Sequence, residues 1–339
     1  MKILITGGAG FIGANCATYF ARNGHRVIIF DNLSRIGSDK NLSWIKSECK
    51  VDFIKGDLRN FKDLINVFSQ KEKFDLILHM GAQVAVTTSV INPRDDFEIN
   101  ALGTFNLLEA MRIYNPKALL IYASTNKVYG EMKNLKIIRN NGRYMYKDLV
   151  EGVDENRSLD FHSPYGCSKG AADQYCLDYY RIYGLKTIVM RQSCIYGYRQ
   201  FGIEDQGWVA WFIIASQLGK PITIYGDGKQ VRDVLFIDDL INAYELAFIS
   251  SERLAGKVFN IGGGDKNTLS LNELIKYLEI LNGRTIPLTY DDWRAGDQKV
   301  YVSNVSYAER EFGWKPDTLA KDGIEKLNGW VKDNIELFE

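Results

Sequence analysis

The first half of the chain alternates short runs of apolar residues with segments whose apolar positions recur at helical spacing. Lys2–Thr6 (KILIT) and Arg26–Phe30 (RVIIF) are two such runs, and Ala14–Arg22 between them has helical spacing and ends at Asn23-Gly24, a typical helix stop. Short apolar strands separated by helices indicate a parallel sheet that is covered on both faces. The same patterns predict strands at Val51–Lys55, Leu76–His79, Ala118–Ala123 and Lys186–Met190, and helices at Phe61–Phe68, Asp96–Tyr114 and Ser163–Tyr183.

Right-handed crossovers between parallel strands produce an open, doubly wound sheet, so we expect an α/β fold of Rossmann type over residues 1–190. Residues 191–339 are less regular and are expected to form a smaller mixed α/β domain, with a segment near 232–262 returning to the sheet. Glu131–Val153 is polar, and we expect a loop or insertion of a length that is typical of functional loops. The second half is predicted to contain helices at Gly207–Leu218, Asp238–Ile249, Leu271–Leu281 and Ala320–Asn334, and short strands near Ile222–Tyr225 and Lys257–Asn260.

Composition narrows the class of protein. Lys plus Arg and Asp plus Glu both total 42 in 339 residues, so the formal net charge is zero, which argues against nucleic acid or an anionic membrane as a partner. The longest apolar stretch, Trp208–Ala215, is too short to span a bilayer, and the apolar run Ile3–Ile5 breaks too early for a signal peptide. Five scattered cysteines without CxxC spacing and three dispersed histidines indicate reduced thiols and no metal site. We therefore expect a soluble, cytoplasmic enzyme.

Glycines at positions 7, 10 and 13 follow the first strand directly and open the first helix. In this context Gly7 permits a tight turn, Gly10 lets the backbone approach a pyrophosphate, and Gly13 allows close packing of helix and strand. The helix N-terminus at Phe11 and Ile12 supplies N–H groups and a positive dipole end. The alternative is an ordinary tight turn, but the position favours binding of a dinucleotide.

Further loop residues fit the same ligand. Asp31-Asn32 ends the second strand, 18 residues after Gly13, where a carboxylate accepts hydrogen bonds from ribose hydroxyls and repels a 2′-phosphate. This favours NAD over NADP, although Arg35 nearby could pair with a phosphate. Two dipeptides after later strands are expected to lie beside the adenine and the pyrophosphate, respectively: Asp57-Leu58 and Gly81-Ala82.

Tyr165 and Lys169 are four residues apart on a predicted helix, so their side chains share one face. An ammonium beside a phenol lowers the pKa of the phenol and suits it to proton transfer. Ser124 and Thr125 follow the fifth strand at the edge of the sheet that faces the ligand crevice, where a hydroxyl can bond the reacting oxygen of a substrate. Ser124 could instead satisfy backbone groups at the strand end.

These motifs together resemble the extended short-chain dehydrogenase/reductase family of nucleotide-sugar epimerases and dehydratases over essentially the whole chain. The resemblance rests on GGAGFIG, Asp31, the Ser124–Gly130 stretch STNKVYG and the Tyr165/Lys169 pair. It implies NAD as cofactor, bound by residues 1–190, and a nucleotide-sugar domain at 191–339. By the same resemblance, the residues implied as catalytic are Thr125, Tyr165 and Lys169, and those implied to contact substrate are Ser124, Gln206, Arg232 and Arg294.

The residues after Thr125 narrow the choice within this family. Dehydratases of the family place Asp-Glu there, whereas this chain has Asn126 and Lys127, which leaves epimerisation or simple redox chemistry. Lys127 is either a solvated loop charge or a contact to phosphate or sugar. The sequences of the segments STNKVYG and LDFHSPYGCSKG resemble the CDP-paratose 2-epimerase group. This resemblance implies inversion at C2 through a transient 2-keto sugar. A UDP-hexose 4-epimerase and a non-catalytic NAD-binding regulator are the alternatives, and a homo-oligomer, dimer or tetramer, is expected.

Overall fold

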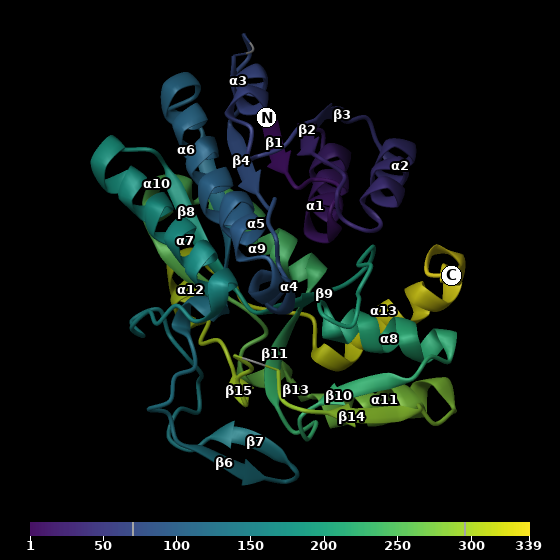
Figure 1. The fold of residues 1–339 in the computed structure, drawn as a ribbon. Coiled ribbons are helices and arrows are strands. Elements are labelled where there is room, and N and C mark those ends of the chain that lie inside the picture. The colour runs from purple at the N-terminus through teal and green to yellow at the C-terminus, as the bar shows by residue number, and fades with distance from the viewer. Residues whose placement is uncertain (70, 295) are drawn as a thin grey trace.

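The computed structural model describes residues 1–69, 71–294 and 296–339 (Figure 1). In these residues seven parallel strands form the central sheet, in the order β12-β8-β5-β4-β1-β2-β3. The order reverses at β1, which lies between β2 and β4, so a crevice opens at the carboxyl ends of these strands. The strands are β1 (Lys2–Thr6), β2 (Arg26–Asp31), β3 (Asp52–Lys55), β4 (Leu76–His79), β5 (Leu119–Thr125), β8 (Thr187–Gln192) and β12 (Val258–Ile261).

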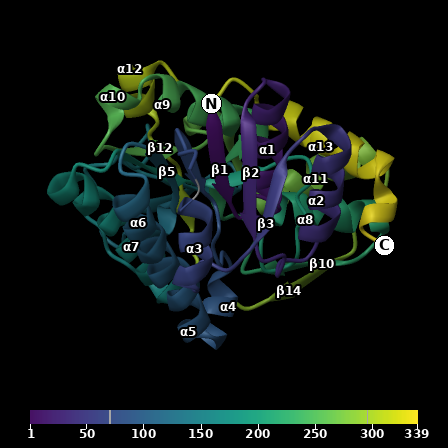
Figure 2. The ribbon, with the colours of Figure 1, turned by 90° about the horizontal axis from the view of Figure 1, so that it is seen from above.

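Helices cover both faces of this sheet because each strand is apolar on both sides. In β1, Ile3 and Ile5 pack into one hydrophobic cluster and Leu4 into the other, and all three are buried. The first cluster includes residues of α1 (Phe11–Arg22), α2 (Ser38–Glu48) and α9 (Ile237–Ile249). The second includes residues of α3 (Phe61–Phe68), α6 (Gly103–Tyr114) and α7 (Ser163–Tyr183), and Figure 2 shows the two layers. The predicted doubly wound α/β fold is confirmed.

The second half of the chain adds smaller sheets beside the carboxyl edge of the central one (Figure 1). The β11 strand pairs with β9, β13 and β15, while β10 and β14 pair with each other. The strands are β9 (Cys194–Tyr196), β10 (Ile222–Tyr225), β11 (Val231–Phe236), β13 (Thr268–Ser270), β14 (Leu288–Asp291) and β15 (Val300–Tyr301). The helices are α8 (Trp208–Leu218), α10 (Ser251–Leu254), α11 (Leu271–Asn282), α12 (Ser306–Phe312) and α13 (Ala320–Asp333).

In the first half, one helix was missed and one expectation needs correction. The α2 helix was not predicted, because its sequence is largely polar and only residues such as Asn41, Leu42 and Ile45 are buried. The helix expected at Asp96–Tyr114 is three pieces: α5 (Pro93–Phe97), a π-helical turn at Glu98–Leu102, and α6. A further short helix, α4 (Val86–Ile91), precedes them.

Residues 131–153 are not a plain loop, since they contain the hairpin of β6 (Ile137–Asn140) and β7 (Arg143–Tyr146). Asn141 and Gly142 have φ of 48° and 80°, the positive values that a two-residue type I′ turn requires. The hairpin packs on the second half of the chain: Tyr144 donates a hydrogen bond to Asp227 (2.8 Å) and Tyr146 to the Val300 carbonyl (2.8 Å).

In the ranges described, no helix combines the length and the apolar character needed to cross a membrane.

Candidate active site

A cavity of about 650 Å³ opens at the carboxyl edge of the central sheet, between that edge and the second half of the chain. It brings together residues from β2, β5, α7 and β11, from the loops that follow β1 and β4, and from the loop before α8. Every site residue predicted from the sequence lines it: Gly7, Gly10, Phe11, Ile12, Gly13, Asp31, Asn32, Asp57, Leu58, Gly81, Ala82, Ser124, Thr125, Tyr165, Lys169, Gln206, Arg232 and Arg294.

The glycine turn between β1 and α1 is packed too closely to accept side chains. A Cβ on Gly7 would lie 2.6 Å from the Gly81 nitrogen, and one on Gly13 would lie 2.3 Å from the Gly7 carbonyl oxygen. Gly7 also has a φ of 65°. No side chain of the described residues caps the N-terminus of α1 at Gly10, and the first residues of this helix line the cavity, so their N–H groups are open to a ligand. These features fit the pyrophosphate of a dinucleotide.

Two carboxylates line the same end of the cavity. Asp31 accepts hydrogen bonds from the backbone N–H groups of Ala9 (3.0 Å) and Leu33 (2.8 Å), which hold it beside the glycine turn. Asp57 accepts bonds from Arg59 (2.8 Å) and Asn32 (3.0 Å), and those from Arg59 hold its pKa down at about 2. Both carboxylates keep lone pairs for the hydroxyl and amino groups of an adenosine.

The reacting end is built from the last residues of β5 and the first turns of α7. The start of α7 is fixed by the Ser163 hydroxyl, which accepts a bond from the Gly166 N–H (3.2 Å), and by Ser89, whose hydroxyl accepts one from the Tyr165 N–H (3.2 Å). The Lys169 ammonium donates to the Ala123 carbonyl (2.6 Å) and lies 4.3 Å from the centre of the Tyr122 ring. Thus Tyr165 and Lys169 face the end of β5.

The expectation that Lys169 lowers the pKa of the Tyr165 phenol is wrong for the protein alone. Burial raises the pKa of Tyr165 to about 12, a rise that hydrogen bonding with Thr125 opposes and the charge of Asp96 reinforces. Burial also lowers the pKa of Lys169 to about 8, against the nearby charges of Cys176, Asp173 and Asp96. The physical reason is that the effect of desolvation on the pKa of Tyr165 exceeds that of the neighbouring groups. The Lys169 ammonium, in turn, donates its hydrogen bond to the Ala123 carbonyl.

Ser124 lines the cavity and also supports the structure around it. Its hydroxyl donates to Asp173 (2.7 Å), and Asp173 forms a buried ion pair with Arg191 (3.0 Å). This arrangement fixes the end of β5 against α7 and β8. Because its hydrogen is donated to Asp173, the Ser124 hydroxyl can contact a substrate only as a hydrogen-bond acceptor.

The sequence patterns did not single out a buried polar cluster that braces α7. Asp96 accepts a hydrogen bond from Ser168 (2.5 Å), which also accepts one from Asn100 (3.1 Å). The Asn100 side chain further exchanges bonds with both backbone groups of Gln83 (2.9 and 3.0 Å), at the loop after β4. The signal in the sequence for Asp96, Asn100 and Ser168 is a polar residue at an otherwise buried helix position.

The substrate side carries several charged groups. Arg232 donates to Asp297 (2.6 Å) and to the Val231 carbonyl (2.8 Å). Arg294 lies over the Tyr225 ring, 3.8 Å from its centre, and forms an ion pair with Asp205 (3.1 Å) in the loop that holds Gln206. Both arginines keep unused N–H donors that suit phosphate oxygens.

The two residues after Thr125 also line the cavity. Asn126 is buried and accepts a bond from the Thr125 hydroxyl (3.3 Å). Lys127 is half-buried, and its ammonium lies 3.5 Å from the Gly296 carbonyl oxygen. The alternative of a freely solvated loop charge is therefore wrong for Lys127.

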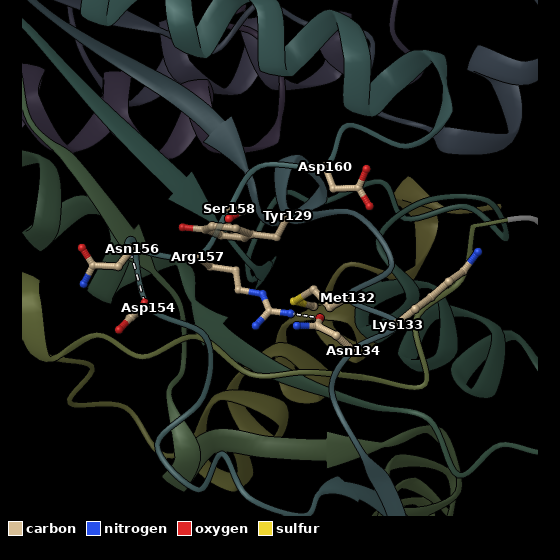
Figure 3. A pocket seen from close by; sticks show the side chains of 9 residues that line it. All are labelled: Tyr129, Met132, Lys133, Asn134, Asp154, Asn156, Arg157, Ser158 and Asp160. Carbon is tan, nitrogen blue, oxygen red and sulfur yellow. Dashed lines mark hydrogen bonds between the residues drawn. The ribbon is translucent and has the colours of Figure 1, made fainter.

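A second cavity, of about 550 Å³, has a different lining that contains none of the predicted site residues. Figure 3 shows Arg157 reaching across it to Asn134, below the Tyr129 ring. Its acidic and basic groups, such as Asp154 and Lys133, are exposed on the surface.

Comparisons with known proteins agree with this geometry. Residues 3–262 match the model of the NAD dependent epimerase/dehydratase family. The chain belongs to this family. A CDP-paratose 2-epimerase of Salmonella typhi is 48% identical over 98% of this chain and 99% of that protein, and a putative UDP-glucose 4-epimerase of Methanocaldococcus jannaschii is 34% identical over the same shares.

Solved structures show the same architecture. A UDP-glucose 4-epimerase of Thermotoga maritima, solved with UDP-glucose, has a TM-score of 0.84 at 30% identity and covers 99% of this chain and all of its own. A Thermus thermophilus UDP-glucose 4-epimerase in complex with NAD also has a TM-score of 0.84 at 30% identity, with shares of 98% and 100%. The predicted family, the NAD cofactor and nucleotide-sugar epimerisation are thereby confirmed.

Proposed function

We propose that this enzyme interconverts CDP-paratose and CDP-tyvelose by inverting C2 through a transient 2-keto sugar. The observation that carries the proposal is the convergence of Thr125, Tyr165 and Lys169 in one cavity with the glycine turn. The high identity to a CDP-paratose 2-epimerase supports the choice of sugar and base.

In the proposed mechanism, Tyr165 acts as the proton carrier. Its oxygen, as phenolate, takes the proton of the C2 hydroxyl and returns it after the sugar has turned its other face. The Thr125 hydroxyl, bonded to Tyr165, orients the same oxygen. NAD, when bound, supplies reversible hydride acceptance and a positive charge that favours phenolate over phenol. Lys169 fixes the end of β5 and keeps ammonium donors for the cofactor ribose.

We also propose that the two halves of the chain bind different ligands. Residues 1–190 bind NAD through the turn at Gly7, Gly10 and Gly13 and through Asp31, while residues 191–339 bind the nucleotide sugar. Arg232 and Arg294 clamp the diphosphate, and Gln206 contacts the nucleoside. A firm grip on the nucleotide leaves the sugar free to turn, which inversion at one carbon requires.

Elimination of water needs an acid and a base beside the sugar, and Asn126 and Lys127 supply no carboxylate where the dehydratase pattern has Asp-Glu. A UDP-hexose 4-epimerase stays the second candidate, because relatives with that name are 30–34% identical over nearly the whole chain.

The substrate test uses the holoenzyme with CDP-paratose and, separately, with UDP-glucose, followed by proton NMR. We expect conversion of CDP-paratose to a mixture with its C2 epimer. Turnover of UDP-glucose alone would replace the proposal with the 4-epimerase.

We further propose a homo-oligomer in the cytoplasm. All five cysteines are free thiols, as a reducing compartment favours. The faces of α6 and α7 that point away from the sheet expose a group of large apolar side chains, a feature typical of an interface. These residues are Phe105, Ile113, Tyr175, Ile182 and Tyr183, and we call them the α6–α7 face.

A further inference from the structure

Lys127 lies on the reacting side of the cavity, close to the diphosphate clamp. It belongs to the 3-10 turn at Asn126–Tyr129 that follows β5, and its backbone N–H donates to the Thr125 hydroxyl (3.2 Å). Its ammonium reaches across to the carbonyl of Gly296, beside Asp297 in the loop that carries Arg294. One side chain therefore connects the catalytic strand end with the substrate loop.

The charges around Lys127 do not balance. Its ammonium interacts electrostatically with the Arg232 guanidinium and with the Asp297 carboxylate, and that carboxylate already accepts a 2.6 Å bond from Arg232. In the part of the chain that the structure describes, no carboxylate forms an ion pair with Lys127. Two cations thus share one anion.

Two neighbouring cations in a partly desolvated place repel one another and favour a further anion between them. Burial and the Arg232 charge lower the pKa of Lys127. This shift agrees with the contacts, because both make the charged ammonium less favourable. Among residues 1–69, 71–294 and 296–339, one partner of the ammonium is found, the Gly296 carbonyl at 3.5 Å, so two of its three donors remain for a ligand.

We propose that Lys127 binds the sugar-proximal phosphate of the nucleoside diphosphate and holds it at a fixed place relative to Thr125 and Tyr165. This inference rests on the proposed function, since it assumes a nucleoside diphosphate in the cavity. Lys127 is then a substrate-binding residue that keeps the pivot of the sugar in place while the ring turns. A cation suits this position, whereas a carboxylate there would repel the phosphate.

The test compares CDP with CMP, which lacks the second phosphate, by calorimetry on the NAD-loaded enzyme. Lys127→Met should weaken CDP binding about tenfold, which equals about 1.4 kcal/mol, and CMP binding less than about twofold, because one charge-assisted hydrogen bond to the second phosphate is lost. Lys127→Arg should retain CDP affinity within about threefold. In steady-state kinetics of Lys127→Met, KM should rise as CDP affinity falls, and kcat should fall as well, because the pivot of the sugar is less firmly placed beside Thr125 and Tyr165.

Lys136→Met is the matched control, since Lys136 is exposed outside this cavity and should change neither affinity. Equal losses for CDP and CMP would overturn the inference, because they would mean that Lys127 only fastens the Gly296 loop. An unchanged CDP affinity would overturn it as well. Failure of wild-type enzyme to bind CDP or UDP would overturn the proposed function itself; if UDP alone binds, the same comparison with UDP and UMP decides on Lys127.

Discussion

The Tyr165 hydroxyl must lose its proton near neutral pH to act as a base, yet burial holds its pKa at about 12 in the protein alone. Lys169 does not relieve this, because its ammonium is bonded to the Ala123 carbonyl and its own pKa is lowered to about 8. The Thr125 hydroxyl is the protein group that favours the phenolate. The proposed role of Tyr165 as the base therefore relies on the positive charge that NAD would bring when bound.

Removing the Tyr165 hydroxyl should abolish proton transfer and leave the cofactor in place. Tyr165→Phe is expected to lower kcat by about 10³-fold, within the range typical of a lost general base, while the NAD content per subunit stays unchanged. The exposed Tyr290→Phe serves as control and should keep wild-type kcat. Wild-type turnover by Tyr165→Phe would refute the assignment of the base.

Lys169 should make stability depend on pH in a defined window. Its pKa is about 8 in the folded protein and 10.5 ordinarily, so between these values the unfolded chain binds more protons. The free energy of unfolding of wild type should therefore rise with pH from 8 to 10.5, relative to Lys169→Met, by at most about 1.4 kcal/mol per pH unit. Urea unfolding at several pH values measures both free energies of unfolding. If wild type and Lys169→Met show the same dependence on pH from 8 to 10.5, the Lys169 ammonium is not desolvated in the folded protein.

At the scale of elements, the position of α7 depends on what lies beneath its first turns. Asp96, Asn100 and Ser168 join α5, the π-helical turn and α7, and Asn100 also ties them to Gln83 after β4. The π-helical turn at Glu98–Leu102 places Asn100 in this buried position. The side chain of Asn100 thus ties α7, which carries Tyr165 and Lys169, to the loop that follows β4 at the carboxyl edge of the sheet.

Asn100→Ala should leave both backbone groups of Gln83 and the Asp96 carboxylate short of partners. We expect a loss of about 2–4 kcal/mol in the free energy of unfolding, since each buried group left unsatisfied costs about 1–3 kcal/mol. Thermal and urea unfolding measure this loss, with the exposed Asn156→Ala as control. A stability change below about 0.5 kcal/mol, the usual limit for surface substitutions, would contradict the bracing role.

The sequence predicts those elements whose burial pattern is simple. The strands Lys2–Thr6 and Leu76–His79 are largely apolar and buried throughout, and the glycines at 7, 10 and 13 stand between a strand and a helix, so both the sheet and the cofactor turn are predictable. The α2 helix and β14 are polar or exposed, and their formation depends on contacts with distant segments. The sequence spacing predicts that Lys169 shares a helix face with Tyr165, and both line the cavity, but the bond from Lys169 to Ala123 depends on the tertiary distance between α7 and β5.

The whole molecule exposes apolar surface that a monomer would leave in water. On the α6–α7 face, Ile182 is 65% exposed and Tyr183 52% exposed, and the rings of Phe105 and Tyr175 contact each other at 5.7 Å between centres. Aromatic side chains grouped in this way are enriched at interfaces between subunits.

A charge placed on this face should separate the subunits. Ile182→Glu is expected to shift the mass measured by light scattering from oligomer toward monomer, because the carboxylate would be buried without a partner. Ile249→Glu changes an equally exposed residue on α9 and should leave the oligomer intact. An unaltered mass for Ile182→Glu would place the interface elsewhere.

The central claim is that one hydrogen leaves C2 and returns to C2 of the same sugar while the cofactor stays in the cavity. The most direct measurement supplies the holoenzyme with CDP-paratose deuterated at C2 and examines the C2 epimer by NMR and mass spectrometry. Retention of deuterium at C2, with none washed out into water, is the predicted result. Replacement of that deuterium by solvent hydrogen, or inversion at C4 in its place, would contradict the mechanism.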